Sequence, residues 1–130
     1  MNDLELIKKA VEAMRFSYSP YSGFKVGAAL LCKNGKVYSG VNIENISFSA
    51  TNCAERTAFF KAISEGETEF LKIAVVGGKD GNITAYCPPC GVCRQVMAEF
   101  CQKDFEIILF NGENTEKYTL DEILPKSFEM

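Results

Sequence analysis

The 130-residue chain contains no histidine and no tryptophan. Without histidine, a metal ion in this protein would need thiolate or carboxylate ligands. Proton transfer near neutral pH would likewise depend on Glu, Asp, Cys or water, because no imidazole is present. The absence of histidine therefore directs attention to the six cysteines and the acidic side chains.

Two further features are missing, and each excludes a class of partner. No run of Lys or Arg stands out and the formal net charge is −3, so no basic stripe is available for a nucleic-acid backbone. No apolar run approaches the ~20 residues that cross a membrane. The first residues also lack the basic region of a signal peptide. We therefore expect a cytoplasmic protein with neither nucleic acid nor a membrane as partner.

The composition is that of an ordinary globular protein, with 47% hydrophobic and 24% charged residues. This length suits one domain, expected over residues 1–130. Periodicity predicts the order α-β-β-α-β-α-β-β, and hence an α/β fold: a three-layer α/β/α sandwich around a mixed sheet of about five strands. The expected strands lie near residues 24–31, 36–43, 71–77, 105–110 and 117–119.

Several local features are also predicted from sequence pattern. The pair Asn34–Gly35 is typical of a type I′ hairpin turn. Asn42 and Glu44 should share one face of the strand near 36–43, because side chains alternate along a strand. The helix that follows Cys53 should be capped by Asn52 or Thr51. Four apolar side chains should line the helix that follows Cys90, namely Val92, Val96, Met97 and Phe100.

Three cysteines form the main candidate site. Cys90 and Cys93 have the spacing that places two side chains on one face of a helix start, and Cys53 opens another predicted helix. Helix N-termini carry partial positive charge, which favours thiolates. Three thiolates would leave the fourth position of a tetrahedral zinc open to water, as in catalytic zinc sites. Glu55 would then be the carboxylate that takes a proton from that water.

Other interpretations of the cysteines stay open. Cys87 could complete a closed, structural four-cysteine zinc site. Cys87 and Cys90 could instead form a thioredoxin-like redox pair. An iron–sulfur pattern would need a further cysteine at position 97, which is Met. Cys32 and Cys101 have the character of buried core thiols.

The segment CAE at 53–55 and the segment PCGVC at 89–93 together resemble the zinc deaminase signature. Further stretches are similar to the small cytidine deaminases with an all-cysteine zinc site: FKVGAAL at 24–30, NIEN at 42–45, NCAERTA at 52–58 and LPKSF at 124–128. The resemblance implies hydrolytic deamination of cytidine and 2′-deoxycytidine to the uridine nucleosides, with release of ammonia. It also implies one Zn²⁺ per subunit, bound by Cys53, Cys90 and Cys93, and a homotetramer whose sites are completed by neighbouring subunits.

The same resemblance implies roles for other residues. Asn42 and Glu44 would bind the ribose hydroxyls, Ala54 would contact the substrate, and Phe24 and Phe128 would pack against the nucleoside. Phe48 stands where close relatives would carry Tyr.

Two considerations from the residues themselves refine this expectation. Arg56, which directly follows Glu55, could bond the thiolates and offset the net charge of −1 that three thiolates give with Zn²⁺. The Glu44 carboxylate would repel a phosphate, which favours a free nucleoside as substrate. Two alternatives remain: another small-molecule zinc deaminase, of the blasticidin-S type, and a zinc-stabilised or redox module without hydrolytic activity.

Overall fold

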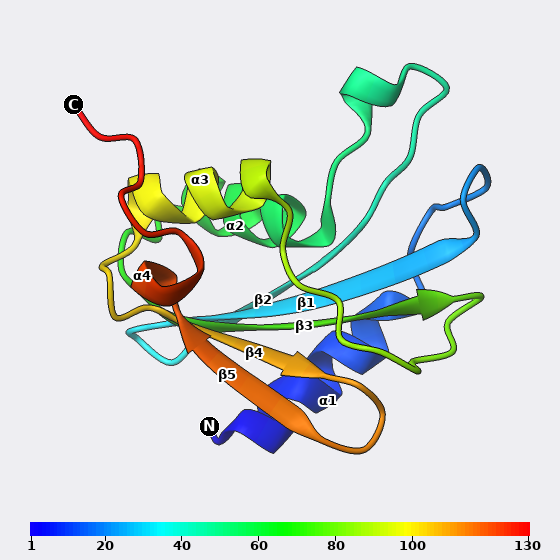
Figure 1. Cartoon of the computed structure of the whole chain (residues 1–130), viewed down its shortest axis with the longest axis horizontal. Helices are drawn as coiled ribbons and strands as arrows, with labels where there is room; N and C mark the ends of the chain where they lie inside the picture. The colour runs from blue at the N-terminus through cyan, green and yellow to red at the C-terminus, as the bar shows by residue number, and fades with distance from the viewer.

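The computed structural model describes all 130 residues and has three layers, with helices on both faces of one sheet (Figure 1). The strand order is β2-β1-β3-β4-β5. Only β3 and β4 run parallel, and the other neighbours are antiparallel, so the sheet is mixed. The predicted three-layer α/β/α arrangement and the predicted element order are confirmed. The strands are β1 (Phe24–Cys32), β2 (Val37–Val41), β3 (Phe70–Lys79), β4 (Glu106–Phe110) and β5 (Thr115–Thr119).

The helices divide between the two faces of the sheet. Helix α1 covers one face alone, and α2, α3 and the short α4 lie on the other (Figure 1). Apolar side chains of α1 such as Leu6 and Ile7 pack on alternate residues of the sheet, while Ala58 and Phe59 of α2 belong to the second core. The bounds are α1 (Asp3–Met14), α2 (Ala54–Ser64), α3 (Gly91–Phe100), α4 (Leu120–Ile123) and the 3-10 turn η1 (Phe48–Ala50).

A glycine in β2 sets how closely α2 can approach the sheet. A Cβ added at Gly40 would lie 2.5 Å from the Ala58 nitrogen and would overlap the carbonyl oxygen of Ala54. Such distances leave no room for any side chain. The start of α2 is therefore fixed against β2, and with it the position of Cys53 just before the helix.

The structure corrects the predicted hairpin. A type I′ turn needs positive φ at both central residues, but only Gly35 has one, at 92°, and Asn34 does not. The Gly35 N–H instead bonds the Cys32 carbonyl at 3.0 Å, which makes a type I turn closed by a left-handed glycine. The strand β2 also ends at Val41, so Asn42 and Glu44 lie beyond the ladder that was predicted to include them.

One prediction about the helices is also wrong, and another is confirmed only in part. The N-cap of α2 is Cys53 itself, and the Asn52 side-chain amide instead donates to the Thr57 hydroxyl at 3.1 Å. Of the four side chains predicted to line α3, Met97 is buried and Val96 packs against the core, whereas Val92 is 58% exposed and Phe100 is exposed as well. The prediction fails in the first turn of α3 because Cys93, and not Val92, faces the core there.

Candidate metal centre and active site

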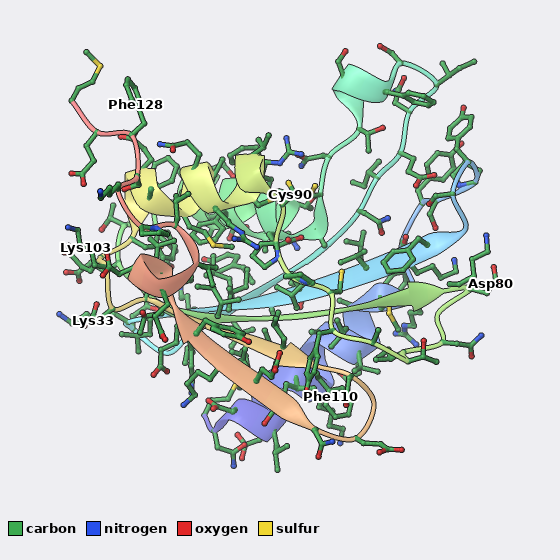
Figure 2. The ribbon with its side chains drawn as sticks, viewed as in Figure 1. Lys33, Asp80, Cys90, Lys103, Phe110 and Phe128 are labelled. Atoms are coloured by element: carbon green, nitrogen blue, oxygen red, sulfur yellow. The ribbon has the colours of Figure 1, made fainter.

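The starts of α2 and α3 bring three cysteine sulfurs together. Cys53 is the N-cap residue of α2, Cys90 is the N-cap residue of α3, and Cys93 lies in the first turn of α3. The three sulfurs lie within 4.8 Å of one another, and those of Cys53 and Cys90 are 3.8 Å apart. Neither cap side chain accepts a bond from a backbone N–H of its own helix. Figure 2 shows Cys90 where the loop from β3 enters α3, above the sheet.

The three cysteines fit a zinc ion. Two Zn–S bonds of ~2.3 Å at a tetrahedral angle place their sulfurs about 3.8 Å apart, which matches the Cys53–Cys90 distance of 3.8 Å. All six cysteines are free thiols. The closed four-cysteine alternative needs Cys87, but its sulfur lies outside the group of three. Three thiolates are the ligand number of a catalytic zinc site rather than of a structural one.

Hydrogen bonds lower the pKa of the Cys53 thiol. A bond from Cys93 and a bond from Arg56, whose guanidinium nitrogen lies 3.2 Å from the Cys53 sulfur, lower the pKa of Cys53 to about 5. Cys93 donates in this pair, so its own pKa is raised. The partial positive charge at the two helix starts acts in the same direction on Cys53. The predicted contact between Arg56 and a site thiol is therefore present.

Glu55 lies beside this group in the first turn of α2. It is only 4% exposed. Burial raises its pKa to about 7, and the negative charge of Cys53 acts in the same direction. A carboxyl group with a pKa near the ambient pH can both accept and release a proton, which is the requirement for a general acid–base.

The Asn42 side chain bonds the start of β1, and the Glu44 side chain bonds the loop that precedes β1. The Asn42 amide accepts from the Val26 N–H at 2.9 Å and donates to the Phe24 carbonyl at 2.8 Å. The Glu44 carboxylate accepts from the Tyr21 N–H at 2.9 Å and from the Ser22 backbone and hydroxyl. Most of the hydrogen-bonding capacity of Asn42 is thus used within the chain, whereas one Glu44 oxygen keeps a free acceptor site.

Glu44 also lines a surface cavity of about 340 Å³. Phe48 lies at the rim of this cavity and is 80% exposed. The hydrogen bonds from Ser22 and Tyr21 hold the pKa of Glu44 below its ordinary value, so the carboxylate stays charged at neutral pH. The cavity therefore presents one fixed negative charge to any ligand.

The remaining predicted residues differ in how near they lie to the thiols. Phe24 lies over Gly77 next to the Cys87 sulfur. The Ala54 side chain is fully buried, so only its backbone could meet a ligand. Phe128 is 75% exposed and lies well apart from Cys90 (Figure 2). Within one chain, Phe128 does not join the other site residues.

Comparisons with known proteins agree with this geometry. The family described as "Cytidine and deoxycytidylate deaminase zinc-binding region" matches residues 1–109. A cytidine deaminase from Halalkalibacterium halodurans is 51% identical over 124 residues, which cover 95% of this chain and 91% of that protein. The crystal structure of a cytidine deaminase from Burkholderia pseudomallei superposes with a TM-score of 0.90 at 43% identity, covering 98% of this chain and 100% of the other.

The chain belongs to this zinc-binding deaminase family. The resemblance stated from the sequence is thereby confirmed. A blasticidin-S deaminase from Bacillus cereus is also similar, at 32% identity over 130 residues, which cover 97% of this chain and 91% of that protein. Family membership therefore leaves more than one small-molecule substrate to consider. None of the helices combines the length and the hydropathy that a membrane span requires.

Two residues that the sequence did not single out hold the backbone next to Cys53 and Cys90. The Thr57 hydroxyl lies 3.2 Å from the Cys53 carbonyl and 3.0 Å from that of Val41, which ties the start of α2 to β2. Arg94 bonds the carbonyl of Pro89, the residue before Cys90, at 2.8 Å. The sequence did hold one signal for this: Arg94 lies four residues after Cys90, the spacing that returns a side chain to the preceding turn.

The Arg56 contact leads to a prediction about thiol chemistry. In protein freed of metal by a chelator, Arg56→Ala should raise the pKa of Cys53, because one of the hydrogen bonds that stabilise the thiolate is lost. Alkylation of Cys53 at pH 6, measured by peptide mass spectrometry, should then be slower than in wild type. The same reaction at pH 9 should differ less. Arg15→Ala, at an exposed helix end, serves as control. If Cys53 were alkylated in Arg56→Ala at the same rates as in Arg15→Ala at both pH values, Arg56 would have no effect on the Cys53 pKa.

Proposed function

We propose that this protein catalyses the zinc-dependent hydrolytic deamination of cytidine and 2′-deoxycytidine, giving uridine and 2′-deoxyuridine plus ammonia, as a step of pyrimidine salvage. The observation that carries the proposal is the buried Glu55, with a pKa of about 7, beside three cysteine sulfurs within 4.8 Å of one another. The 51% identity of the chain to a cytidine deaminase supports cytidine as the substrate.

The proposed chemistry divides between the metal and the chain. Zinc, when bound by Cys53, Cys90 and Cys93, would supply a Lewis acid and a more acidic water. Glu55 accepts a proton at its carboxylate, delivers it to the ring nitrogen of the base, and then supports departure of ammonia. One water is consumed for each ammonia released. Arg56, bonded to Cys53, draws negative charge away from the three thiolates.

We infer that a free nucleoside is the substrate. The free acceptor site on Glu44 would take a ribose hydroxyl, and Asn42 has one amide N–H beyond its bond to Phe24 to offer. Phe24 would pack against the nucleoside, and the backbone of Ala54 would contact the base. A nucleotide is disfavoured because its phosphate would meet the charged Glu44 carboxylate.

The second candidate is deamination of a blasticidin-S-like compound. The 32% identity to a blasticidin-S deaminase supports it, because the same Glu55 chemistry would serve both substrates. Comparing kcat/KM for cytidine and for blasticidin S on one enzyme preparation distinguishes the two. We expect cytidine to have the higher kcat/KM, in line with the higher identity to cytidine deaminases.

The proposal includes a homotetramer with one zinc per subunit, each subunit being one domain of residues 1–130. Exposed apolar side chains support an assembly: Ile46 is 81% and Phe48 is 80% exposed on the loop that projects from the sheet (Figure 1). The separation of Phe128 from Cys90 supports a site completed by a neighbour. We further propose a cytoplasmic location, since six free thiols suit a reducing compartment.

Glu55→Gln tests the proposed chemistry. The variant should bind zinc as wild type does, because the three sulfurs are untouched. Its cytidine turnover, followed by ultraviolet absorbance, should fall ~10²–10⁴-fold, the usual contribution of general acid–base catalysis. Glu65→Gln, at the exposed far end of the same helix, should keep wild-type rates. Turnover by Glu55→Gln close to wild type would exclude Glu55 as the proton carrier.

Phe128 tests the shared site. Stacking of an aromatic ring on a base contributes ~1–3 kcal/mol, so Phe128→Ala should lower kcat/KM for cytidine roughly 10–100-fold. Zinc content should not change. Mixing Glu55→Gln subunits with Phe128→Ala subunits should restore activity, because a site with intact Glu55 can receive an intact Phe128 from its neighbour. A mixture no more active than its components, with subunit exchange confirmed, would show that Phe128 does not act across subunits.

A further inference from the structure

Arg94 bridges two segments that are far apart in the sequence. Its Nε donates to the Pro89 carbonyl at 2.8 Å, and a terminal nitrogen donates to the Ile123 carbonyl at 2.7 Å. The side chain itself is half-buried on α3, immediately after Cys93. One guanidinium therefore contacts both the loop that leads into the thiol site and the end of α4.

The Pro89 contact acts on a metal ligand. Pro89 is less than 2% exposed, and a buried carbonyl needs a hydrogen-bond partner. Arg94 is the only partner that the Pro89 carbonyl has, since no backbone N–H bonds it. This carbonyl belongs to the peptide group that joins Pro89 to Cys90. Holding it fixes the backbone from which the Cys90 sulfur approaches Cys53.

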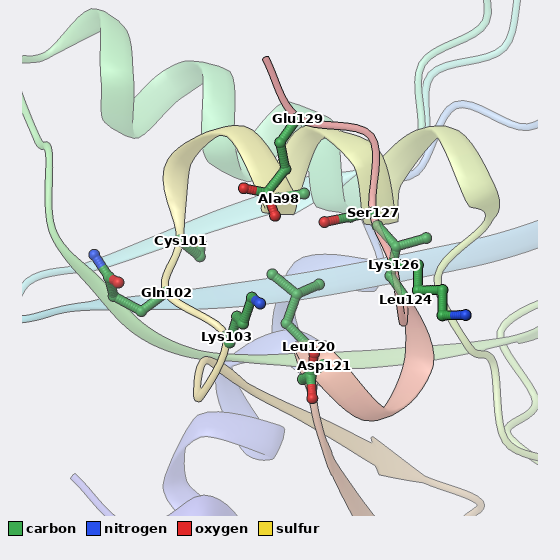
Figure 3. Close-up of a pocket in the computed structure, with 10 residues that line it drawn as sticks. All are labelled: Ala98, Cys101, Gln102, Lys103, Leu120, Asp121, Leu124, Lys126, Ser127 and Glu129. Carbon is green, nitrogen blue, oxygen red and sulfur yellow. The ribbon is translucent and has the colours of Figure 1, made fainter.

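The Ile123 contact acts on the C-terminal tail. Ile123 is the last residue of α4, and residues 124–130 continue over the outer side of α3. A cavity of about 190 Å³ separates parts of the tail from α3, with Lys126, Ser127 and Glu129 around it (Figure 3). Leu124, at the start of the tail, packs against the core, and polar contacts also hold the tail. Gln95, next to Arg94, supplies one by donating to the Phe128 carbonyl at 3.1 Å.

We propose that Arg94 is a positioning residue that fixes the Cys90 ligand and the start of the C-terminal tail through one guanidinium. Arg94 and Gln95 together would anchor the tail at both ends, whereas only Arg94 reaches the metal-binding loop. The effect on Cys90 does not depend on the substrate. The effect on Phe128 rests on the proposed function, because it assumes that Phe128 covers the base.

The test compares three variants of the zinc-loaded protein. Zinc release to an excess of a coloured chelator should be about 10–100-fold faster in Arg94→Met than in wild type, the usual cost of losing a residue that orients a metal ligand. The release rate of Arg94→Lys should lie between those of wild type and Arg94→Met, because one ammonium cannot reproduce the two separated donors of a planar guanidinium. Gln95→Met should release zinc at the wild-type rate but raise the KM for cytidine.

Each outcome decides the proposal. Wild-type zinc release by a folded Arg94→Met protein would overturn it, as would equally fast release by Gln95→Met, which would show that the tail alone controls the metal. Circular dichroism establishes folding, and if Arg94→Met does not fold, the comparison of Arg94→Lys with Gln95→Met is judged by the same criteria. A wild-type protein that holds zinc without deaminating cytidine would contradict the proposed function and leave the zinc-release test intact.

Discussion

The convergence of two helix starts is the constraint on which the rest of the site depends. The Cys53 and Cys90 sulfurs, 3.8 Å apart, come from the cap positions of α2 and α3. Thiols brought so close must share protons or a metal, because several uncompensated negative charges cannot sit side by side away from water. The sheet enforces this proximity, since Gly40 sets the approach of α2 and the buried Pro89 leads the chain into α3.

Much of this arrangement could be predicted from sequence because it is encoded locally. The C-x-x-C spacing of Cys90 and Cys93 placed both side chains on one face of a helix start, and the structure has them there. The predicted element order and layers followed from periodicity and turns. The partnership of Cys53 with the pair at 90 and 93, across 36 intervening residues, followed from the need for a third ligand and from the place of Cys53 at the start of another predicted helix.

Other features could not be predicted, because they depend on contacts between distant segments. The depth at which α3 packs decides that Cys93 and Met97 are buried while Val92 is exposed, and periodicity alone does not show which face turns inward. The Asn42 amide bonds the backbone of β1, and the alternation of side chains along a strand could not predict that contact. Arg94 has no motif of its own, and its role appears only once the loop before Cys90 and the end of α4 are seen together.

We infer that three sulfurs of this chain hold one zinc and leave a fourth position to a small oxygen ligand. X-ray absorption spectroscopy at the zinc edge of the purified protein tests it directly. We expect three sulfur scatterers at ~2.3 Å and one oxygen at ~2.0 Å, with one zinc per chain, and no fourth sulfur because Cys87 lies outside the group. A spectrum that requires four sulfurs, or only two, would contradict it.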